Sequence, residues 1–207
     1  SKIFKFMFIP NISDYKIILA SQSPRRHYLL KEIGLAFEIK SKGFVEESYP
    51  EELKEDEIPR YIAKKKANVF NDLHENEIVI TADTIVWLNG KVLQKPKDHD
   101  DAVNILRQLS GSCHQVFTGV CIKSKTKEFA FTAQTDVYFK KLTYAEIDYY
   151  LNHYQPMDKA GAYGIQEWIG YIGVEKINGS FFNVMGLPIQ KLYSELDNFI
   201  NDQIEEI

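Results

Sequence analysis

Apolar residues occur along this chain in two patterns, short continuous runs and stripes at helical spacing. Runs predict buried strands, and stripes with period 3.6 predict helices that pack by one face. Strands are expected at residues 16–20, 36–48 (where the strand passes into a loop), 77–93, 114–122, 128–142 and 171–179. Helices are expected at residues 24–33, 58–74 and 98–111, from Thr143 onward, and from Pro188 onward as an amphipathic terminal helix.

Turn and cap signals mark the ends of several of these elements. Residues 77–93 are two apolar runs, and the second turns at Asn89-Gly90, a pair typical of a hairpin. The strand at 171–179 ends in a second Asn-Gly pair. Thr143 and Glu146 have the spacing of a capping box. Residues 157–168 are a glycine-rich loop. Helices and strands that are mixed along the whole chain predict an α/β fold.

Length and composition narrow the class of protein. The 207 residues suffice for one large domain or two small lobes, and a net charge of -4 argues against a general nucleic-acid-binding surface. Cys113 and Cys121 are too few for a disulfide framework, which favours a reducing, cytoplasmic location. The apolar stretch before Pro10 is too short to span a bilayer and lacks a clear cleavage site. We therefore expect residues 1–14 to be an N-terminal extension and expect no membrane partner.

The segment LASQSPRRHYLL (residues 19–30) has the form of an anion site. Ser23 is a good N-cap, and Pro24 suits the first helical position. Arg25 and Arg26 then lie in the first turn, where the helix dipole disfavours cations unless an anion is bound. Phosphate at the helix N-terminus, with bidentate contacts from the arginines, would explain them. The alternative is two solvated arginines beside an ordinary cap.

Asp83 interrupts the otherwise apolar run IVITADTIVW, and Thr84 beside it offers a hydroxyl. A carboxylate in such a run is costly unless it is paired, binds a metal or reaches a cleft. Asp83 is therefore a candidate general base on water and a candidate ligand for Mg²⁺ or Mn²⁺. The alternative is an aspartate at a strand end that caps a loop.

Lysines and a second acidic group complete the candidate set. Lys66 lies within the apolar stripe of the helix at 58–74, where it either neutralises phosphate or extends outward to water. Lys95 follows the hairpin, and Glu46 or Glu47 could supply a second metal ligand or simply belong to an acidic loop. The glycine-rich loop adds Asp158, Lys159 and Gln166, and the amide of Gln166 could read a base edge. Loop lysines are otherwise usually solvated.

Other chemistries fit the residues less well. The cysteines and histidines lack the spacing of a zinc site, and neither a Walker loop nor a dinucleotide fingerprint is present in the sequence. The five histidines show no clustering that would single out a triad base.

Five segments together resemble the Maf family of nucleoside triphosphate pyrophosphatases: ILASQSPRRHYLL, TADTIVWLNGKVLQKP, LSGSCHQVFTGV, PMDKAGAYGIQ and INGSFFNVMGLP. The resemblance runs in order from about Ile17 to Leu196, which places the family domain at residues 15–207. It implies an elongated mixed-sheet fold in two lobes around a central cleft, similar to that of inosine triphosphate pyrophosphatases. It also implies hydrolysis between the α- and β-phosphates with Mg²⁺ or Mn²⁺, and dimers are frequent in the family.

The resemblance also assigns roles. Asp83 would accept a proton, and Asp83 with Glu47 would hold the metal. Ser21, Ser23, Arg25 and Arg26 would form the first phosphate-binding motif, and Arg25, Thr84 and Gln166 would set substrate choice. Glu47, Lys66, Lys95, Asp158 and Lys159 match further active-site positions, with Lys66 and Lys95 neutralising phosphate charge.

The glycine-rich loop looks like that of the family branch acting on dTTP and UTP, and some members act on modified pyrimidine nucleotides. One departure is Glu167-Trp168, where the family usually has Gly after the Gln. Two other functions remain open, a non-catalytic nucleotide sensor that regulates cell division and an inosine/xanthosine triphosphate pyrophosphatase.

Overall fold

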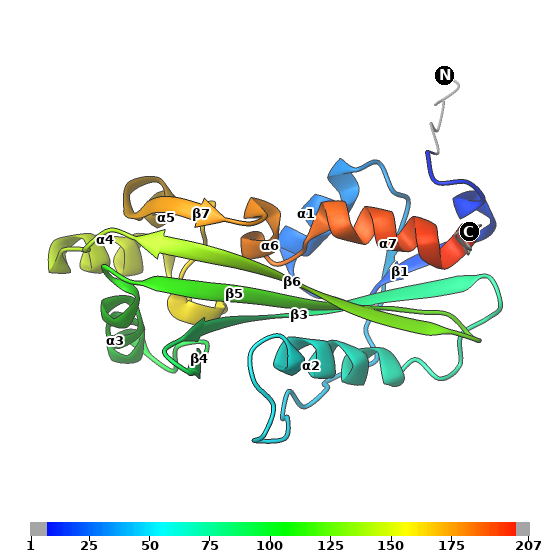
Figure 1. The fold of residues 1–207 in the computed structure, drawn as a ribbon, viewed down its shortest axis with the longest axis horizontal. Coiled ribbons are helices and arrows are strands. Elements are labelled where there is room, and N and C mark those ends of the chain that lie inside the picture. Colours follow the sequence, from blue (N-terminus) through cyan, green and yellow to red (C-terminus); the bar gives the residue numbers. More distant parts are fainter. Residues whose placement is uncertain (1–7, 202–207) are drawn as a thin grey trace, which may run out of the picture.

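The computed structural model describes residues 8–201, and these form a mixed seven-stranded sheet with helices on both faces (Figure 1). The strand order is β2-β1-β3-β5-β6-β7, and the short β4 pairs with β3. β1 is parallel to β2 and β3, and the other pairs are antiparallel. The strands are β1 (Lys16–Leu19), β2 (Glu38–Ile39), β3 (Glu77–Leu88), β4 (Lys91–Leu93), β5 (Cys113–Lys123), β6 (Glu128–Phe139) and β7 (Val174–Asn178).

The helices divide between the two faces of the long β3-β5-β6 ribbon. α2 covers one face, and α1, α6 and α7 cover the other, while α3 and α4 lie toward one end of the elongated molecule (Figure 1). The α-helices are α1 (Pro24–Glu32), α2 (Glu57–Asn68), α3 (His99–Leu109), α4 (Tyr144–Tyr154), α5 (Trp168–Gly173), α6 (Phe181–Met185) and α7 (Ile189–Asn201). Two 3-10 turns, η1 (Ile12–Asp14) and η2 (Ala160–Ala162), complete the described elements.

The predicted elongated α/β fold is confirmed, and the local signals account for most element ends. The Ser23 hydroxyl accepts a hydrogen bond from the Arg26 amide as the N-cap of α1, and the capping box of Thr143 and Glu146 opens α4. Asn89 and Gly90 both have positive φ, as a two-residue hairpin of type I′ requires. Each of these motifs satisfies a backbone group locally, so it forms without help from distant residues.

Several predicted elements differ from the structure in their bounds. The helix expected at 58–74 ends at Asn68, because the chain leaves it to bury Phe70 and Leu73 in a separate cluster with β1 and β3. The strand expected at 171–179 begins only at Val174, because residues 168–173 form α5. A Cβ at Gly170 would lie 1.8 Å from the Ile165 carbonyl oxygen, so this glycine permits the tight turn before β7.

The two apolar runs expected within residues 77–93 are joined in one long strand, β3, and the expected turn at Asn89-Gly90 leads from it into the short β4. β3 continues without interruption through Asp83, which pairs with Gly119 of β5. The interpretation of Asp83 as a strand-end cap is therefore wrong. Thr81 and Thr135 are also buried within the long strands, so polar residues are not confined to their ends.

The residues before β1 contact the main body where they are described. Residues 1–7 of the expected N-terminal extension lie outside the described range, but Ile9 and Ile12 are buried in the principal core. Asn11 donates a hydrogen bond to Asn201 at the end of α7. Within residues 8–201, no helix has the length and apolar character needed to cross a membrane.

Candidate active site

A gap along one edge of β3 creates the principal cleft. β1 pairs with β3 only as far as Ile80, and β4 begins to pair at Val86, so among the described strands residues 81–85 have no neighbour on this edge. Consecutive side chains of a strand point to opposite faces. At this gap the cleft can therefore receive Asp83 from one face and Thr84 from the other.

The cleft has a volume of about 560 Å³ and opens between the two groups of helices. It is lined by all the site residues predicted from the sequence, namely Ser21, Ser23, Arg25, Arg26, Glu47, Lys66, Asp83, Thr84, Lys95, Asp158, Lys159 and Gln166. Glu46 is not among the lining residues, which resolves the choice between the two adjacent glutamates in favour of Glu47.

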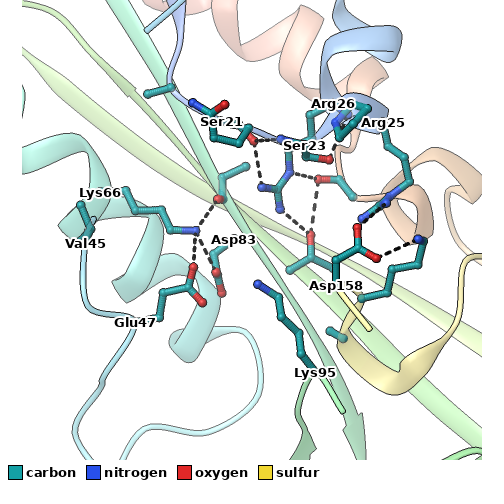
Figure 2. Close-up of a pocket in the computed structure, with 18 of the residues that line it drawn as sticks. Ser21, Ser23, Arg25, Arg26, Val45, Glu47, Lys66, Asp83, Lys95 and Asp158 are labelled. Carbon is teal, nitrogen blue, oxygen red and sulfur yellow. Dashed lines mark hydrogen bonds and ion pairs between the residues drawn. The ribbon is translucent and has the colours of Figure 1, made fainter. Parts of the chain in front are cut away.

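Two carboxylates share one ammonium group on the α2 side of β3 (Figure 2). The Lys66 Nζ lies 3.1 Å from Asp83 Oδ1 and 3.1 Å from Glu47 Oε1. It also donates to the Ala82 carbonyl at 3.2 Å, one of the groups that the gap in the sheet leaves unpaired. The inward position of Lys66 thus satisfies a free strand edge and compensates a buried acid.

α2 is held against the sheet beside these groups. The Thr81 hydroxyl donates to the Ala63 carbonyl at 2.6 Å, in the turn of α2 that precedes Lys66. Gly119, directly across the ladder from Asp83, would place a Cβ 2.4 Å from the backbone of Pro59 and Arg60. Only a glycine lets the helix approach the strand this closely.

The environments of the two carboxyl groups move their pKa values in opposite directions. Desolvation raises the pKa of Asp83, and the nearby charge of Glu47 adds to this, although Lys66 and Arg26 oppose it. Burial also acts to raise the pKa of Glu47, but Lys66, Lys95 and Arg26 together lower it below its ordinary value. Neighbouring acids whose pKa values are pushed apart are typical of acid–base sites.

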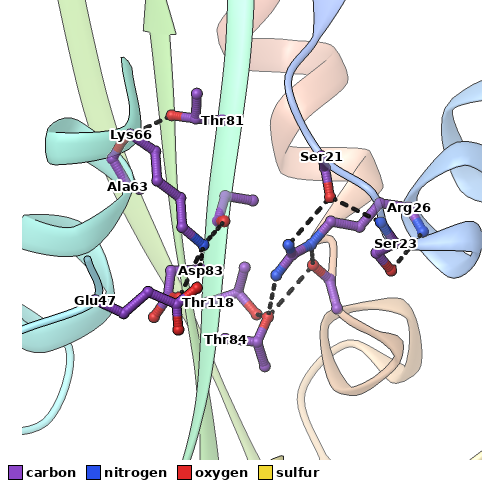
Figure 3. Close-up of polar contacts among 12 residues, drawn as sticks. Ser21, Ser23, Arg26, Glu47, Ala63, Lys66, Thr81, Asp83, Thr84 and Thr118 are labelled. Atoms are coloured by element: carbon purple, nitrogen blue, oxygen red, sulfur yellow. Dashed lines mark hydrogen bonds and ion pairs between the residues drawn. The ribbon is translucent and has the colours of Figure 1, made fainter. Parts of the chain in front are cut away.

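The other face of β3 presents Thr84 to Arg26 (Figure 3). The Arg26 guanidinium donates to the Gly186 carbonyl at 2.7 Å, to Thr84 Oγ1 at 3.1 Å and to Ser21 Oγ at 3.4 Å. Its acceptors are therefore neutral oxygens, and its positive charge is not cancelled by a direct ion pair with any described residue. Burial lowers the pKa of Arg26, but a guanidinium remains charged at neutral pH.

Several groups of this network were not predicted from the sequence. The Thr84 and Thr118 hydroxyls lie 2.8 Å apart, and Thr118 donates to the Asn183 carbonyl of α6. The fully buried Asn183 side chain in turn donates to Val116, Ala133 and Thr135. α6 thereby fixes the Gly186 carbonyl that receives Arg26. Backbone carbonyls carry no side-chain signal, but the buried Asn183 could have been suspected from the segment FFNVMG.

The remaining basic groups stand at the rim of the cleft. Arg25 donates to the Met185 carbonyl at 3.2 Å and lies 3.9 Å from Asp158. The Lys95 amine points into the cleft on the side of Glu47 and Asp83 (Figure 2). No hydrogen bond or ion pair joins Lys95 to another residue in the range 8–201, so its charge is available to an anion.

The glycine-rich loop closes one end of the cleft, which Asp158, Lys159 and Gln166 line. Lys159 Nζ lies 3.1 Å from Asp158 Oδ1 and 3.5 Å from Glu167 Oε1. The Oε1 atom of Gln166 is buried and has no hydrogen-bond partner among the described residues. A buried amide oxygen without a partner is costly, so this atom is suited to a donor that a ligand brings.

The donor set on the α2 side suits a hard divalent cation. The hydrogen bonds within residues 8–201 engage only Oδ1 of Asp83 and Oε1 of Glu47, which leaves the second oxygen of each carboxylate without a protein partner. No cluster of three or more His, Cys, Asp or Glu suited to a metal occurs in this range. Mg²⁺ is commonly held by one or two carboxylates together with substrate phosphates, so a pair fits.

A family model described as Maf-like protein matches residues 16–199. The chain belongs to the Maf family. Its relatives include proteins named dTTP/UTP pyrophosphatase from Phocaeicola vulgatus and Bacteroides thetaiotaomicron, each 56% identical. The matches cover 91% and 90% of this chain and 98% and 97% of those proteins, respectively. A protein of the same name from Porphyromonas gingivalis is 47% identical over 92% of this chain and 98% of its own length.

Solved structures resemble this Maf protein only weakly. The Ham1 protein of Staphylococcus aureus matches with a TM-score of 0.43 and 15% identity, over 60% of this chain and 71% of that one. A structure from Mycobacterium abscessus titled nucleoside-triphosphatase / dITP/XTP pyrophosphatase also has a TM-score of 0.43, with 16% identity over 90% and 98% of the two chains. The Maf assignment therefore rests on the sequence matches.

Proposed function

We propose that this protein hydrolyses dTTP and UTP between the α- and β-phosphates, releasing the nucleoside monophosphate and pyrophosphate. The observation that carries the proposal is a cleft with an acid pair at one side of β3 and the uncancelled guanidinium of Arg26 at the other, ending at the unpartnered Gln166 oxygen. The relatives named dTTP/UTP pyrophosphatase support the same activity.

The phosphates bind the cationic groups that converge on the cleft. Arg26 is pre-oriented by its three neutral acceptors, so its fork is held in place before the substrate arrives. Arg25 and Lys95 add charge at the rim. Pro24 has no N–H and the Arg26 N–H is bound by Ser23, so the Arg25 N–H is the backbone donor left for an anion in the first turn of α1. These contacts orient the triphosphate with its α-phosphate toward Asp83.

Asp83 accepts a proton from the attacking water at its carboxylate oxygen. Its raised pKa makes it a stronger base than an exposed aspartate, and Lys66 keeps the buried carboxylate oriented. Asp83 and Glu47 would hold Mg²⁺ or Mn²⁺, which supplies charge neutralisation of the phosphates and a more acidic water when bound. Lys66 additionally offsets the negative charge that accumulates where the two carboxylates meet the phosphates.

Base selection follows from the hydrogen-bonding pattern of the pyrimidine ring. Thymine and uracil carry an N3–H donor, which suits the unpartnered Gln166 oxygen, whereas cytosine has an acceptor at the same place. A site built for a donor rejects an analogue that lacks it. Thr84, which we expected to select the base, accepts a hydrogen bond from Arg26, so we assign it to holding that arginine.

The test is a substrate panel with Mg²⁺ or Mn²⁺, in which pyrophosphate release is measured for dTTP, UTP, dCTP, CTP, ITP and XTP. We expect dTTP and UTP to be preferred, and Asp83→Asn serves as the inactive control. Preferred turnover of ITP or XTP would support the inosine/xanthosine alternative. Binding of dTTP without turnover of any nucleotide would support the nucleotide sensor.

Other features of the proposed enzyme remain predictions. They are a pyrophosphatase domain at residues 15–207, a cytoplasmic location and a homodimer. Modified pyrimidine triphosphates belong in an extended panel, because the donor at N3 is shared by many ring-substituted uracils.

A further inference from the structure

Glu167 stands at the N-cap of α5, but its side chain does not cap the helix. A carboxylate at this position ordinarily accepts hydrogen bonds from the first free N–H groups of the helix. The Glu167 side chain instead turns back toward the glycine-rich loop, and only 17% of it is exposed. Because the Glu167 carboxylate does not cap α5, groups outside this helix must stabilise it.

Its partners are Lys159, which lines the cleft, and Tyr150, which does not. Glu167 Oε1 is 3.5 Å from Lys159 Nζ and accepts a hydrogen bond from the Tyr150 hydroxyl at 3.3 Å. The same hydroxyl accepts the Gly164 N–H at 3.0 Å, and Tyr150 is fully buried. Glu167 therefore links Lys159 to the backbone of the loop through one buried phenol.

The loop is packed tightly around this carboxylate. A Cβ at Gly164 would lie 2.4 Å from Glu167 Oε1, 3.1 Å from Gln166 Nε2 and 3.1 Å from Lys159 Cε. The three side chains thus meet over one glycine, at the end of the cleft where the Gln166 oxygen is unpartnered. Lys159 also donates a hydrogen bond to Asp158 Oδ1 at 3.1 Å, but the Asp158 side chain is 67% exposed, so water screens that ion pair more than the pair with the mostly buried Glu167.

We propose that Glu167 is a positioning residue for base selection, which holds the Lys159 ammonium beside Gln166 so that it donates to the C4 carbonyl oxygen of thymine or uracil. The inference rests on the proposed function as a pyrimidine nucleoside triphosphate pyrophosphatase. Cytosine presents an amino group in place of one of these carbonyls, so a fixed ammonium opposes it. Glu167 is not among the cleft-lining residues, and it acts through Lys159.

The experiment compares kcat/KM for dTTP and dCTP in wild type, Glu167→Gln, Lys159→Met and the double variant. Glu167→Gln keeps the shape and removes the charge, and we expect the dTTP:dCTP ratio to fall about tenfold, the effect of losing one charge-assisted contact. In the Lys159→Met background the same substitution should change the ratio less than about twofold, because the contact it acts through is already gone.

The control is Glu175→Gln, the same change at an exposed site on β7, which should leave the ratio unaltered. A structural defect alone would lower kcat/KM equally for both substrates. An unchanged ratio in Glu167→Gln, or a tenfold change that persists in the Lys159→Met background, overturns the inference. Absence of dTTP hydrolysis by the wild type would instead overturn the proposed function, so the two failures are distinguishable.

Discussion

The two faces of β3 meet at the same gap but use different chemistry. On the α2 face, Asp83 and Glu47 share the ammonium of Lys66, so charges are paired closely. On the opposite face, Arg26 is held by neutral oxygens of Thr84, Gly186 and Ser21, so its charge is oriented without being cancelled. In the proposed enzyme, one unpaired strand edge therefore supplies a base on one side and a phosphate anchor on the other.

Asp83→Asn gives the largest expected effect, because it removes the proposed base. We expect kcat for dTTP to fall about 10³-fold, within the usual range for loss of a general base. The Kd for dTTP should change much less, since the phosphate anchor Arg26 lies on the other face. Calorimetric binding alongside steady-state kinetics tests this separation, and near-normal turnover would remove Asp83 from its role.

Lys66→Met should lower kcat about 10²-fold, comparable to the loss of one preorganised charge at a reacting centre. The methionine fills a similar volume but leaves the two carboxylates without their shared cation. Lys66→Arg keeps a positive charge and should recover part of the loss. Equal activity of the methionine and arginine variants would show that the charge of Lys66 is not what matters.

Arg26→Lys tests the opposite face. A lysine cannot reproduce the three contacts of the guanidinium fork, so we expect KM for dTTP to rise about tenfold with a smaller change in kcat. Lys64→Arg, on the exposed side of α2, is a control for a general change of basic residue. A drop in kcat as large as that of Asp83→Asn would contradict the assignment of proton transfer and phosphate binding to different faces of β3.

His114→Phe should leave both faces intact and alter only stability and its pH dependence. Burial lowers the pKa of His114 from 6.5 to about 3, so the unfolded chain binds this proton first as pH falls. The contribution of His114 to the free energy of unfolding is therefore lost as the pH falls from about 6.5 to 3, at up to about 1.4 kcal/mol per pH unit. Replacing His114 should reduce this slope, and also cost about 1 kcal/mol at neutral pH through the lost Tyr163 hydrogen bond. Urea unfolding at several pH values measures both, and identical slopes would contradict the assignment.

The sequence predicts the charged half of the site better than the neutral half. Asp83 and Lys66 are conspicuous because each places a charge within an apolar pattern, and both line the cleft. Gly186 contributes only a backbone carbonyl, and Thr118 is an ordinary strand residue in sequence terms. Their role arises from packing of α6 against β5, which periodicity does not encode.

The fold shows the same division between local and distant signals. Caps and turns such as Ser23 and Asn89-Gly90 are confirmed because their hydrogen bonds form within a few residues. The end of α2 was misplaced because Phe70 continues the helical stripe yet is buried in a different cluster. The gap in β3 also depends on where two other strands stop, which a single run of residues cannot reveal.

Product analysis tests the central claim most directly. Purified protein is incubated with UTP and Mg²⁺ or Mn²⁺, and the nucleotide and phosphate products are quantified together. The account predicts UMP and pyrophosphate in equal amounts, because Asp83 and Glu47 act at the α-phosphate while the cations hold the β- and γ-phosphates. Formation of UDP with inorganic phosphate would contradict it, since water would then attack the γ-phosphate.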